Sequence, residues 1–227
     1  MSNANHARFR AAPWYGEPLN LTVGGAGGIG SWLTLMLARG GHYIQLYDYD
    51  RIDRTNMAGQ LYATTDIGSL KADTAARIAI EFCGDDLVSN YGKFERGYST
   101  RSITFACFDS MSARKLMFNE WKRRNKYTRS DRPCLFIDGR MEAESFQVYC
   151  VTPKDADRYE ATLFNDNEVE DAPCSMKATS HMGAHISAVM TEYFNNHVAN
   201  VRTGFNDRDV PFSHVWHSPM AYLEQEF

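Results

Sequence analysis

The chain has 227 residues, of which 44% are hydrophobic, with a formal net charge of −4 and a pI near 6.0. This size predicts a single domain with one sizeable core. Because a slightly acidic chain lacks a global basic field, the charge argues against a nucleic-acid partner. No apolar run reaches the roughly 18 to 20 residues that cross a bilayer, and the polar first ten residues lack the core of a signal peptide. We therefore expect a cytoplasmic protein with no membrane segment.

Five cysteines, at positions 83, 107, 134, 150 and 174, include no C-x-x-C pair. An odd number without paired spacing predicts thiols, and neither a disulfide framework nor a four-cysteine zinc site.

Residues 1–19 carry Arg8 and Arg10, three aromatic residues and two prolines without periodicity, which predicts an extended arm. A strand follows at residues 21–23. From this point the pattern changes to one that is typical of an α/β domain.

A glycine motif, Gly25-x-Gly27-x-x-Gly30, lies between this strand and a helix predicted over residues 29–39. Gly25 permits a tight turn, Gly27 lets the backbone approach a phosphate, and Gly30 lets the helix pack close to the sheet. Free N–H groups and the positive end of the helix dipole attract an anion to this turn. The motif predicts a nucleotide site in a doubly wound, Rossmann-like sheet.

The second predicted strand, residues 43–47, ends in Asp48, eighteen residues after Gly30. A carboxylate there is placed to accept hydrogen bonds from ribose hydroxyls. An NAD(P)-dependent oxidoreductase would share these features. It would not need the polar run that follows, from Asp48 through Asp50 and Asn56 to Gln60.

Three motifs in this order resemble one family. They are GGIGS at residues 27–31, the run from Asp48 to Gln60, and DIGSLKA at residues 66–72. Together they resemble the adenylating enzymes of the ThiF, MoeB and ubiquitin-activating group, over roughly residues 20–200. The resemblance implies that the chain binds ATP and transfers AMP to the C-terminal carboxylate of a ubiquitin-like protein, a sulfur-carrier protein or a peptide. It also implies that Asp48 holds the ribose, and that Asn56 and Lys71 contact the phosphates.

The chain departs from the family in two places. Gly59 stands where the family usually has an arginine on the phosphates. The resemblance implies that an N-terminal arginine, Arg8 or Arg10, reaches the ATP of a partner subunit in a homodimer; two solvated arginines are the simpler alternative. The paired C-x-x-C motifs that bind structural zinc in many bacterial members are also missing.

A helix is predicted over residues 71–83, with Ser69 as its N-cap. Lys71 then lies in the first turn, where a cation opposes the helix dipole. A bound phosphate would remove this conflict, so we favour a ligand contact over a solvated lysine. A third strand is expected within residues 84–100.

A buried strand over residues 103–108 ends in Asp109, and a helix follows to about Arg124. An acid at the carboxyl end of a central strand lies on the ligand edge of such a sheet. The resemblance implies that Asp109, in the pattern Asp-x-x-x-x-Arg with Arg114, holds Mg²⁺, for which one carboxylate is adequate. The alternative role for Asp109 is the helix N-cap.

Residues 134–139 predict a buried strand, and residues 145–152 predict an antiparallel edge strand. A polar, acidic crossover at 153–174 precedes a helix over about 181–200. The resemblance makes Cys174 a candidate for thioester formation, since a thiol near a helix start gains acidity. The alternative is that Cys174 is an incidental loop cysteine. His181 and His185 stand four apart, a spacing that is more typical of a surface than of a metal site without a third ligand.

The sequence thus predicts an α/β fold of the doubly wound, Rossmann-like type, with a mostly parallel sheet and an antiparallel extension. We divide it into an arm (1–19), an ATP-binding adenylation domain (20–200) and a C-terminal tail (201–227). The predicted cofactors are ATP and Mg²⁺. The rivals are an NAD(P)-dependent oxidoreductase and a non-catalytic binding module, which Gly59 favours. The site residues are assigned as nucleotide-binding, Gly25, Gly27, Gly28, Gly30, Asp48, Asp50, Gln60 and Lys71; catalytic, Lys71, Asn56, Asp109 and Cys174; and metal-binding, Asp109.

Overall fold

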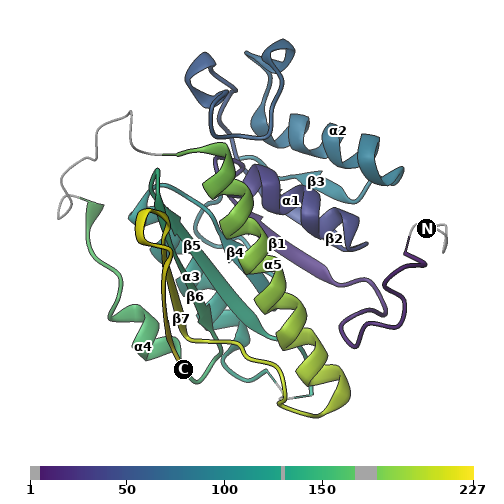
Figure 1. Cartoon of the computed structure of the whole chain (residues 1–227), viewed down its shortest axis with the longest axis vertical. Helices are drawn as coiled ribbons and strands as arrows, with labels where there is room; N and C mark the ends of the chain where they lie inside the picture. Colours follow the sequence, from purple (N-terminus) through teal and green to yellow (C-terminus); the bar gives the residue numbers. More distant parts are fainter. Residues whose placement is uncertain (1–5, 129–130, 167–177) are drawn as a thin grey trace.

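A computed structural model describes residues 6–128, 131–166 and 178–227 (Figure 1). Across these residues one sheet of eight strands runs in the order β3-β2-β1-β4-β5-β6-β7-β8. The first five are parallel and the last three are antiparallel to their neighbours. The bounds are β1 Asn20–Gly24, β2 Tyr43–Tyr47, β3 Val88–Asn90, β4 Ile103–Ala106, β5 Leu135–Met141, β6 Ser145–Val151, β7 Ser213–His217 and β8 Tyr222–Glu226.

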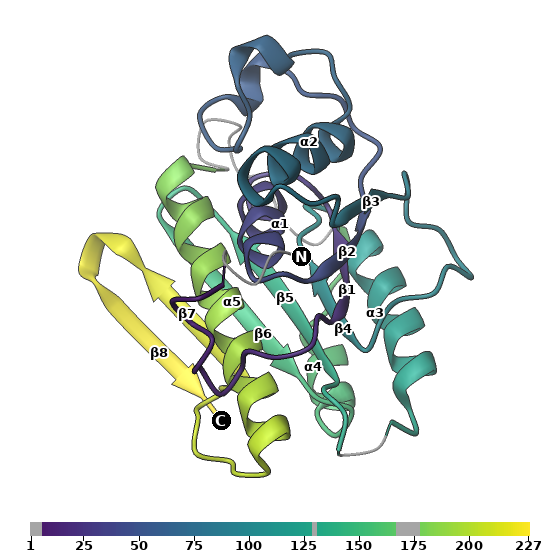
Figure 2. The ribbon, with the colours of Figure 1, turned by 90° about the vertical axis from the view of Figure 1, so that its right-hand side faces the viewer.

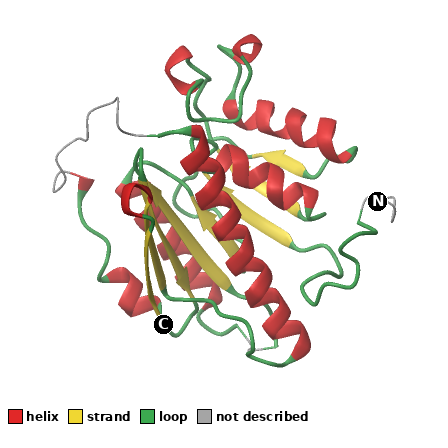
Figure 3. Ribbon diagram, viewed as in Figure 1, coloured by secondary structure: helices red, strands yellow, loops and turns green. Residues whose placement is uncertain are grey.

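Helices cover both faces of the sheet, and α5 crosses it diagonally (Figure 3). Two buried clusters fill the two sides, one under α1, α2 and α5 and the other under α3 and α4. Strand β5 contributes to both, because Leu135 and Ile137 point to the first cluster and Phe136 to the second. The bounds are α1 Gly30–Arg39, α2 Lys71–Cys83, α3 Met111–Asn125, α4 Ala156–Glu160 and α5 Ser180–Thr203, with 3₁₀ turns at Arg54–Asn56, Thr64–Asp66 and Ser218–Met220.

The predicted fold class is confirmed, because the parallel half is doubly wound about β1 and the rest extends it in antiparallel fashion. Three local predictions were wrong. The N-terminal arm is not extended, since it forms consecutive turns in which the Phe9 N–H donates to the His6 carbonyl at 3.2 Å and the Ala12 N–H to the Phe9 carbonyl at 2.9 Å. Strand β6 is not an edge, since β7 pairs with its outer side and β8 forms the exposed edge (Figure 2). Ser69 does not cap α2, because Leu70 holds the N-cap position and no side chain caps that end.

The N-terminal arm lies against the body at the amino ends of the strands. Trp14 packs on the larger core cluster. The guanidinium of Arg202, near the end of α5, donates to the carbonyl oxygens of Trp14 and Glu17, the latter at 2.8 Å. Among the described residues, none of the helices is long and apolar enough to cross a membrane.

Candidate functional site

The glycine turn lies at the switch point of the sheet, where β1 and β4 pair and their chains turn to opposite faces. Gly25 has φ of +92°, and a Cβ there would lie 2.8 Å from the Cys107 carbonyl oxygen. A Cβ on Gly30 would lie 1.8 Å from the Gly25 carbonyl oxygen, which forbids any side chain. These two glycines therefore serve the turn itself.

Gly27 and Gly28 are the half-exposed part of the turn. A Cβ on Gly27 would meet only the Gln60 side-chain nitrogen, at 3.9 Å, so its outer side is open. Helix α1 begins at Gly30, with no side-chain cap and no acid in its first turn. Its amino end is consequently available to an anion.

Asp48 holds the turn from the end of β2. Its carboxylate accepts hydrogen bonds from the Ala26 N–H at 2.7 Å and the Asp50 N–H at 2.8 Å. Burial raises the pKa of Asp48 above its usual value, although these two N–H groups and the Lys71 charge oppose the rise. The carboxylate is thus half-enclosed beside the glycine turn, as the predicted ribose contact requires.

Lys71 is not a solvated lysine, since it is only 8% exposed. Its ammonium lies 3.0 Å from the Asp50 carboxylate, and its backbone N–H donates to the Asp50 carbonyl at 2.9 Å. Asp50 therefore fixes both ends of this residue and balances the charge that opposes the α2 dipole.

The amide-rich loop folds over the turn. The Asn56 side-chain oxygen accepts from the Asp53 N–H at 2.8 Å, which closes a capping box around the 3₁₀ turn at 54–56. Farther along, Leu61 N–H donates to the Ser31 hydroxyl at 3.0 Å. Gln60 lies over Gly27, and its side-chain oxygen is buried with no hydrogen-bond partner in the described structure. A ligand that carries a donor would satisfy this buried acceptor.

The surrounding structure explains why residue 59 is a glycine. A Cβ there would lie 3.0 Å from the Ala178 Cβ, and the Gly59 carbonyl accepts from the Trp32 indole at 3.3 Å. On α5, a Cβ at Gly183 would lie 2.4 Å from the Gly28 carbonyl oxygen and 3.3 Å from that of Gly59. The first turn of α5 therefore packs against the loops that contain Gly28 and Gly59. It leaves little space for the side chain of the family's arginine at position 59.

Asp109 is exposed at the end of β4. It is not the N-cap of α3, because Ser110 takes that place and accepts from the Ala113 N–H at 3.2 Å. Asp166 covers the same helix end, accepting from the Met111 N–H at 2.6 Å. The capping alternative for Asp109 is therefore excluded, and its carboxylate faces solvent on the ligand edge.

Arg114, the last residue of the Asp-x-x-x-x-Arg pattern, turns away from solvent. It is 5% exposed and donates to the Asp138 carboxylate and to the Gly139 and Phe108 carbonyl oxygens, at 2.8 Å for Gly139. Asp138 also accepts from Arg140 at 2.8 Å and from the Tyr159 hydroxyl at 3.0 Å. This buried network fixes the end of β4 that carries Asp109.

Two residues near the site were not predicted from the sequence. Asp138 lies within a predicted buried strand, where an acid is itself a signal of a buried ionic network. Tyr62 carried no signal in its spacing, yet its hydroxyl donates to the Ala26 carbonyl at 2.6 Å.

Other predicted residues lie apart. Arg8 and Arg10 belong to the arm at the amino ends of the strands, across the sheet from the glycine turn (Figure 1). His185 contacts Phe146 and Trp216 instead of a third ligand, and among the described residues no group of three metal-binding side chains occurs. Cys174 lies outside the described residues.

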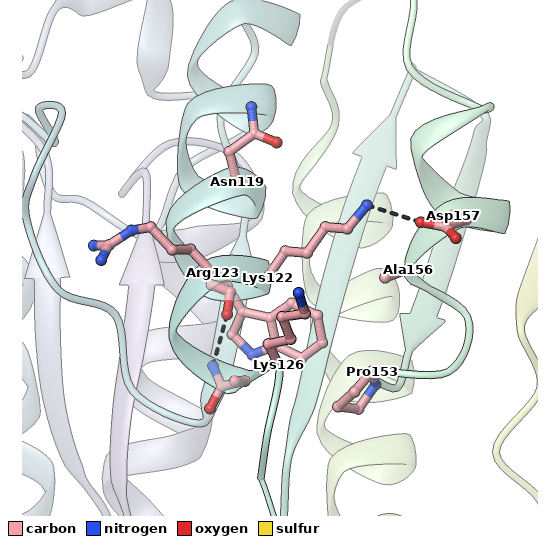
Figure 4. Close-up of a pocket in the computed structure, with 9 residues that line it drawn as sticks. Asn119, Lys122, Arg123, Lys126, Pro153, Ala156 and Asp157 are labelled. Atoms are coloured by element: carbon pink, nitrogen blue, oxygen red, sulfur yellow. Dashed lines mark hydrogen bonds and ion pairs between the residues drawn. The ribbon is translucent and has the colours of Figure 1, made fainter.

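A hollow of about 430 Å³ between α3 and α4, lined by Lys122, Lys126 and Asp157, also lies away from the glycine turn (Figure 4).

A family model described as the ThiF family matches residues 19–204. This chain belongs to the ThiF family. The resemblance inferred from the three motifs is thereby confirmed. A search of curated proteins finds no match.

Solved structures share the fold of this ThiF-family chain. PaaA superposes with a TM-score of 0.65 at 15% identity, over 94% of this chain and 64% of its own. Escherichia coli MccB with MccA-N7isoASN gives 0.66 at 12% identity, over 100% and 72%. MccB with ATP gives 0.64 at 14% identity, over 94% and 64%. The chain therefore spans about two thirds of the length of these proteins.

Proposed function

We propose that the chain adenylates the C-terminal carboxylate of a peptide or of a small ubiquitin-like or sulfur-carrier protein, using ATP. The observation that carries the proposal is one cluster at the carboxyl ends of β1 and β2. There the open side of Gly27, the Asp48 carboxylate, the Gln60 side chain and the buried Lys71 meet. Membership of the ThiF family supports it, as do the MccB structures with ATP and with MccA.

Each residue has a distinct task in this proposal. Asp48 accepts from the ribose hydroxyls, and the N–H groups of Gly27 and Gly28 face the phosphates. Lys71, with Asn56 and Gln60 nearby, stabilises negative charge that shifts to the departing pyrophosphate. Because Asp50 already holds Lys71 in place, little reorganisation is needed when the nucleotide binds.

The reaction needs no acid or base. One oxygen of the substrate carboxylate attacks the α-phosphorus, and the bond from that phosphorus to the bridging oxygen of pyrophosphate breaks. The products are an acyl adenylate and pyrophosphate. The protein contributes alignment and charge stabilisation, which dominate in such transfers.

Asp109 is the residue that would hold Mg²⁺. Its carboxylate is exposed on the ligand edge, and the Arg114 network fixes the strand end behind it, so the residues fit a cation that takes one carboxylate, phosphates and water. Bound there, Mg²⁺ would neutralise charge on the ATP phosphates.

Cys174 is our candidate for a second step, in which its sulfur attacks the acyl carbon and AMP leaves. Four other cysteines are described, and burial raises the pKa of all of them, to about 11 for Cys134. They are poor nucleophiles, which leaves Cys174 as the candidate.

Pyrophosphate release with candidate peptides and carrier proteins tests the proposal. We expect release only with an acceptor that has a free C-terminus, and none with the same acceptor amidated there. Cys174→Ala should keep ATP–pyrophosphate exchange and lose a reductant-sensitive adduct with the acceptor. Exchange that is independent of any carboxylate would contradict adenylation; an adduct that survives in Cys174→Ala would contradict only the second step.

The two rivals give different results. A non-catalytic binding module would bind acceptor without any pyrophosphate release. An oxidoreductase would bind NAD in preference to ATP, and it would have no use for Lys71 at the phosphate end of the site.

A further inference from the structure

Tyr62 lies between the glycine turn and the first turn of α2. Its hydroxyl donates to the Ala26 carbonyl at 2.6 Å and lies 3.3 Å from the Lys71 carbonyl oxygen. A phenol has one hydrogen, so the shorter contact is the principal bond. Burial, followed by the charges of Asp48 and Asp66, raises the pKa of Tyr62 far above its usual value, which keeps the hydroxyl a donor.

The backbone N–H and carbonyl of Ala26 consequently both have hydrogen-bond partners. Its N–H donates to Asp48 at 2.7 Å, and its carbonyl accepts from Tyr62. In a trans peptide the carbonyl of one residue and the N–H of the next point in opposite directions. With the Ala26 carbonyl turned toward Tyr62, the Gly27 N–H must point away from Tyr62. Within the described residues no acceptor contacts it.

We propose that Tyr62 is a positioning residue that turns the Gly27 N–H toward the phosphates of the bound nucleotide. This role rests on the proposed function, since it requires a phosphate ligand. The neighbours of Tyr62 serve the same end, because Leu61 N–H binds the Ser31 hydroxyl and Gln60 lies over Gly27. The segment 60–62 thus fixes the conformation of the turn from one side while Asp48 fixes it from the other.

The test compares ATP with adenosine by isothermal titration calorimetry. Tyr62→Phe removes the hydroxyl and keeps the ring. We expect ATP affinity to fall about 3- to 10-fold, the value of one hydrogen bond, and adenosine affinity to stay within about twofold. Tyr193→Phe is the matched control, since that hydroxyl also binds neighbours, Gln225 at 2.7 Å among them, far from the turn. It should leave both affinities unchanged.

An unchanged ATP affinity in Tyr62→Phe, or equal losses for ATP and adenosine, would overturn the positioning role. Absence of ATP binding by the wild-type chain would instead refute the proposed function, and the role with it. A second measurement does not depend on the variant folding. In the ¹⁵N spectrum of the wild-type protein, the Gly27 amide should shift with ATP and not with adenosine, and a Gly27 amide that ATP leaves unmoved would also overturn the role.

Discussion

Lys71 and Asp50 form the ion pair that sets the charge beside the glycine turn. Lys71 is almost fully buried, whereas the Asp50 side chain is 53% exposed. Removing the lysine therefore leaves a carboxylate that water can still solvate, so the cost in stability stays within about 1 kcal/mol. The main loss should fall on catalysis.

We predict that Lys71→Met lowers the rate of ATP–pyrophosphate exchange by about 10² to 10³, as loss of one preorganised charge does, while the melting temperature changes little. Methionine keeps the apolar stem. Lys122→Met is the matched control, because Lys122 also pairs with acids, Asp157 and Glu160, but lies on α3 away from the turn. Full exchange activity in Lys71→Met would show that the phosphates bind elsewhere.

Spacing along the sequence is enough to single out Lys71 as a candidate site residue, because a lysine in the first turn of a helix conflicts with the dipole. Tyr62 could not be predicted, because its role depends on how far the loop folds back over the turn. Gly59 could be noticed but not explained, since the residues that occupy its space, Ala178 and Gly183, lie more than a hundred positions away.

Gly183 in the first turn of α5, and Ala178 in the segment just before this helix, form a wall of the site. We predict that Gly59→Arg, which restores the family's residue, destabilises the protein by about 1 to 3 kcal/mol through overpacking, and lowers ATP affinity. Ala178→Gly in the same chain should recover much of both losses, because it removes the Cβ at 3.0 Å. Thermal unfolding and ATP titration measure the two effects. Higher activity from Gly59→Arg alone would contradict this account of α5.

Two histidines, the buried His42 and the half-buried His197, join elements as acceptors. His42 accepts from the Leu19 N–H and His197 on α5 from the Cys134 N–H, each at 3.2 Å. Burial lowers the pKa of each from 6.5 to about 4. Between those values the unfolded chain binds more protons than the folded one, so stability is lost as pH falls from 6.5 to 4.

We predict that the free energy of unfolding drops by on the order of 3 kcal/mol per histidine over this range. In denaturant titrations from pH 7 to 4, His197→Gln should have a shallower decline than the wild type. The exposed His181→Gln serves as the control and should follow the wild type. Identical slopes for all three proteins would contradict the prediction.

Most elements could be predicted from periodicity and glycine spacing, and α2 was predicted to the residue. The antiparallel end could not be predicted in full. Strand β8 is exposed along its whole length, so it carries no alternation of apolar and polar residues. Because the sequence did not predict β7 and β8, it predicted β6 as the edge strand.

The N-terminal arm lies at the end of the sheet opposite the glycine turn of its own chain (Figure 1). Arg202 anchors it at the amino ends of the strands, and β1 alone separates the two edges by roughly 16 Å. We propose that Arg8 and Arg10 act on the site of a second chain in a homodimer, in place of the arginine missing at Gly59.

Complementation tests this arrangement. We predict that a chain with Arg8→Ala and Arg10→Ala, and a chain with Lys71→Met, are each nearly inactive alone but regain activity when mixed. In the mixed dimer one site receives an intact arm and an intact lysine. Matching losses in Arg51→Ala with Arg54→Ala, together with no complementation, would place the arginine in the same chain. Full activity from a monomeric protein without the arm would exclude supply by a partner.

We propose that this edge of the sheet recognises a nucleoside triphosphate rather than a dinucleotide. The most direct measurement is the free energy of unfolding of the wild-type chain with saturating ATP and Mg²⁺, and separately with NAD. A ligand at about one hundred times its dissociation constant adds roughly 2.7 kcal/mol. We predict this increase in the free energy of unfolding with ATP and Mg²⁺, and no increase with NAD. An equal or larger gain with NAD would contradict the account.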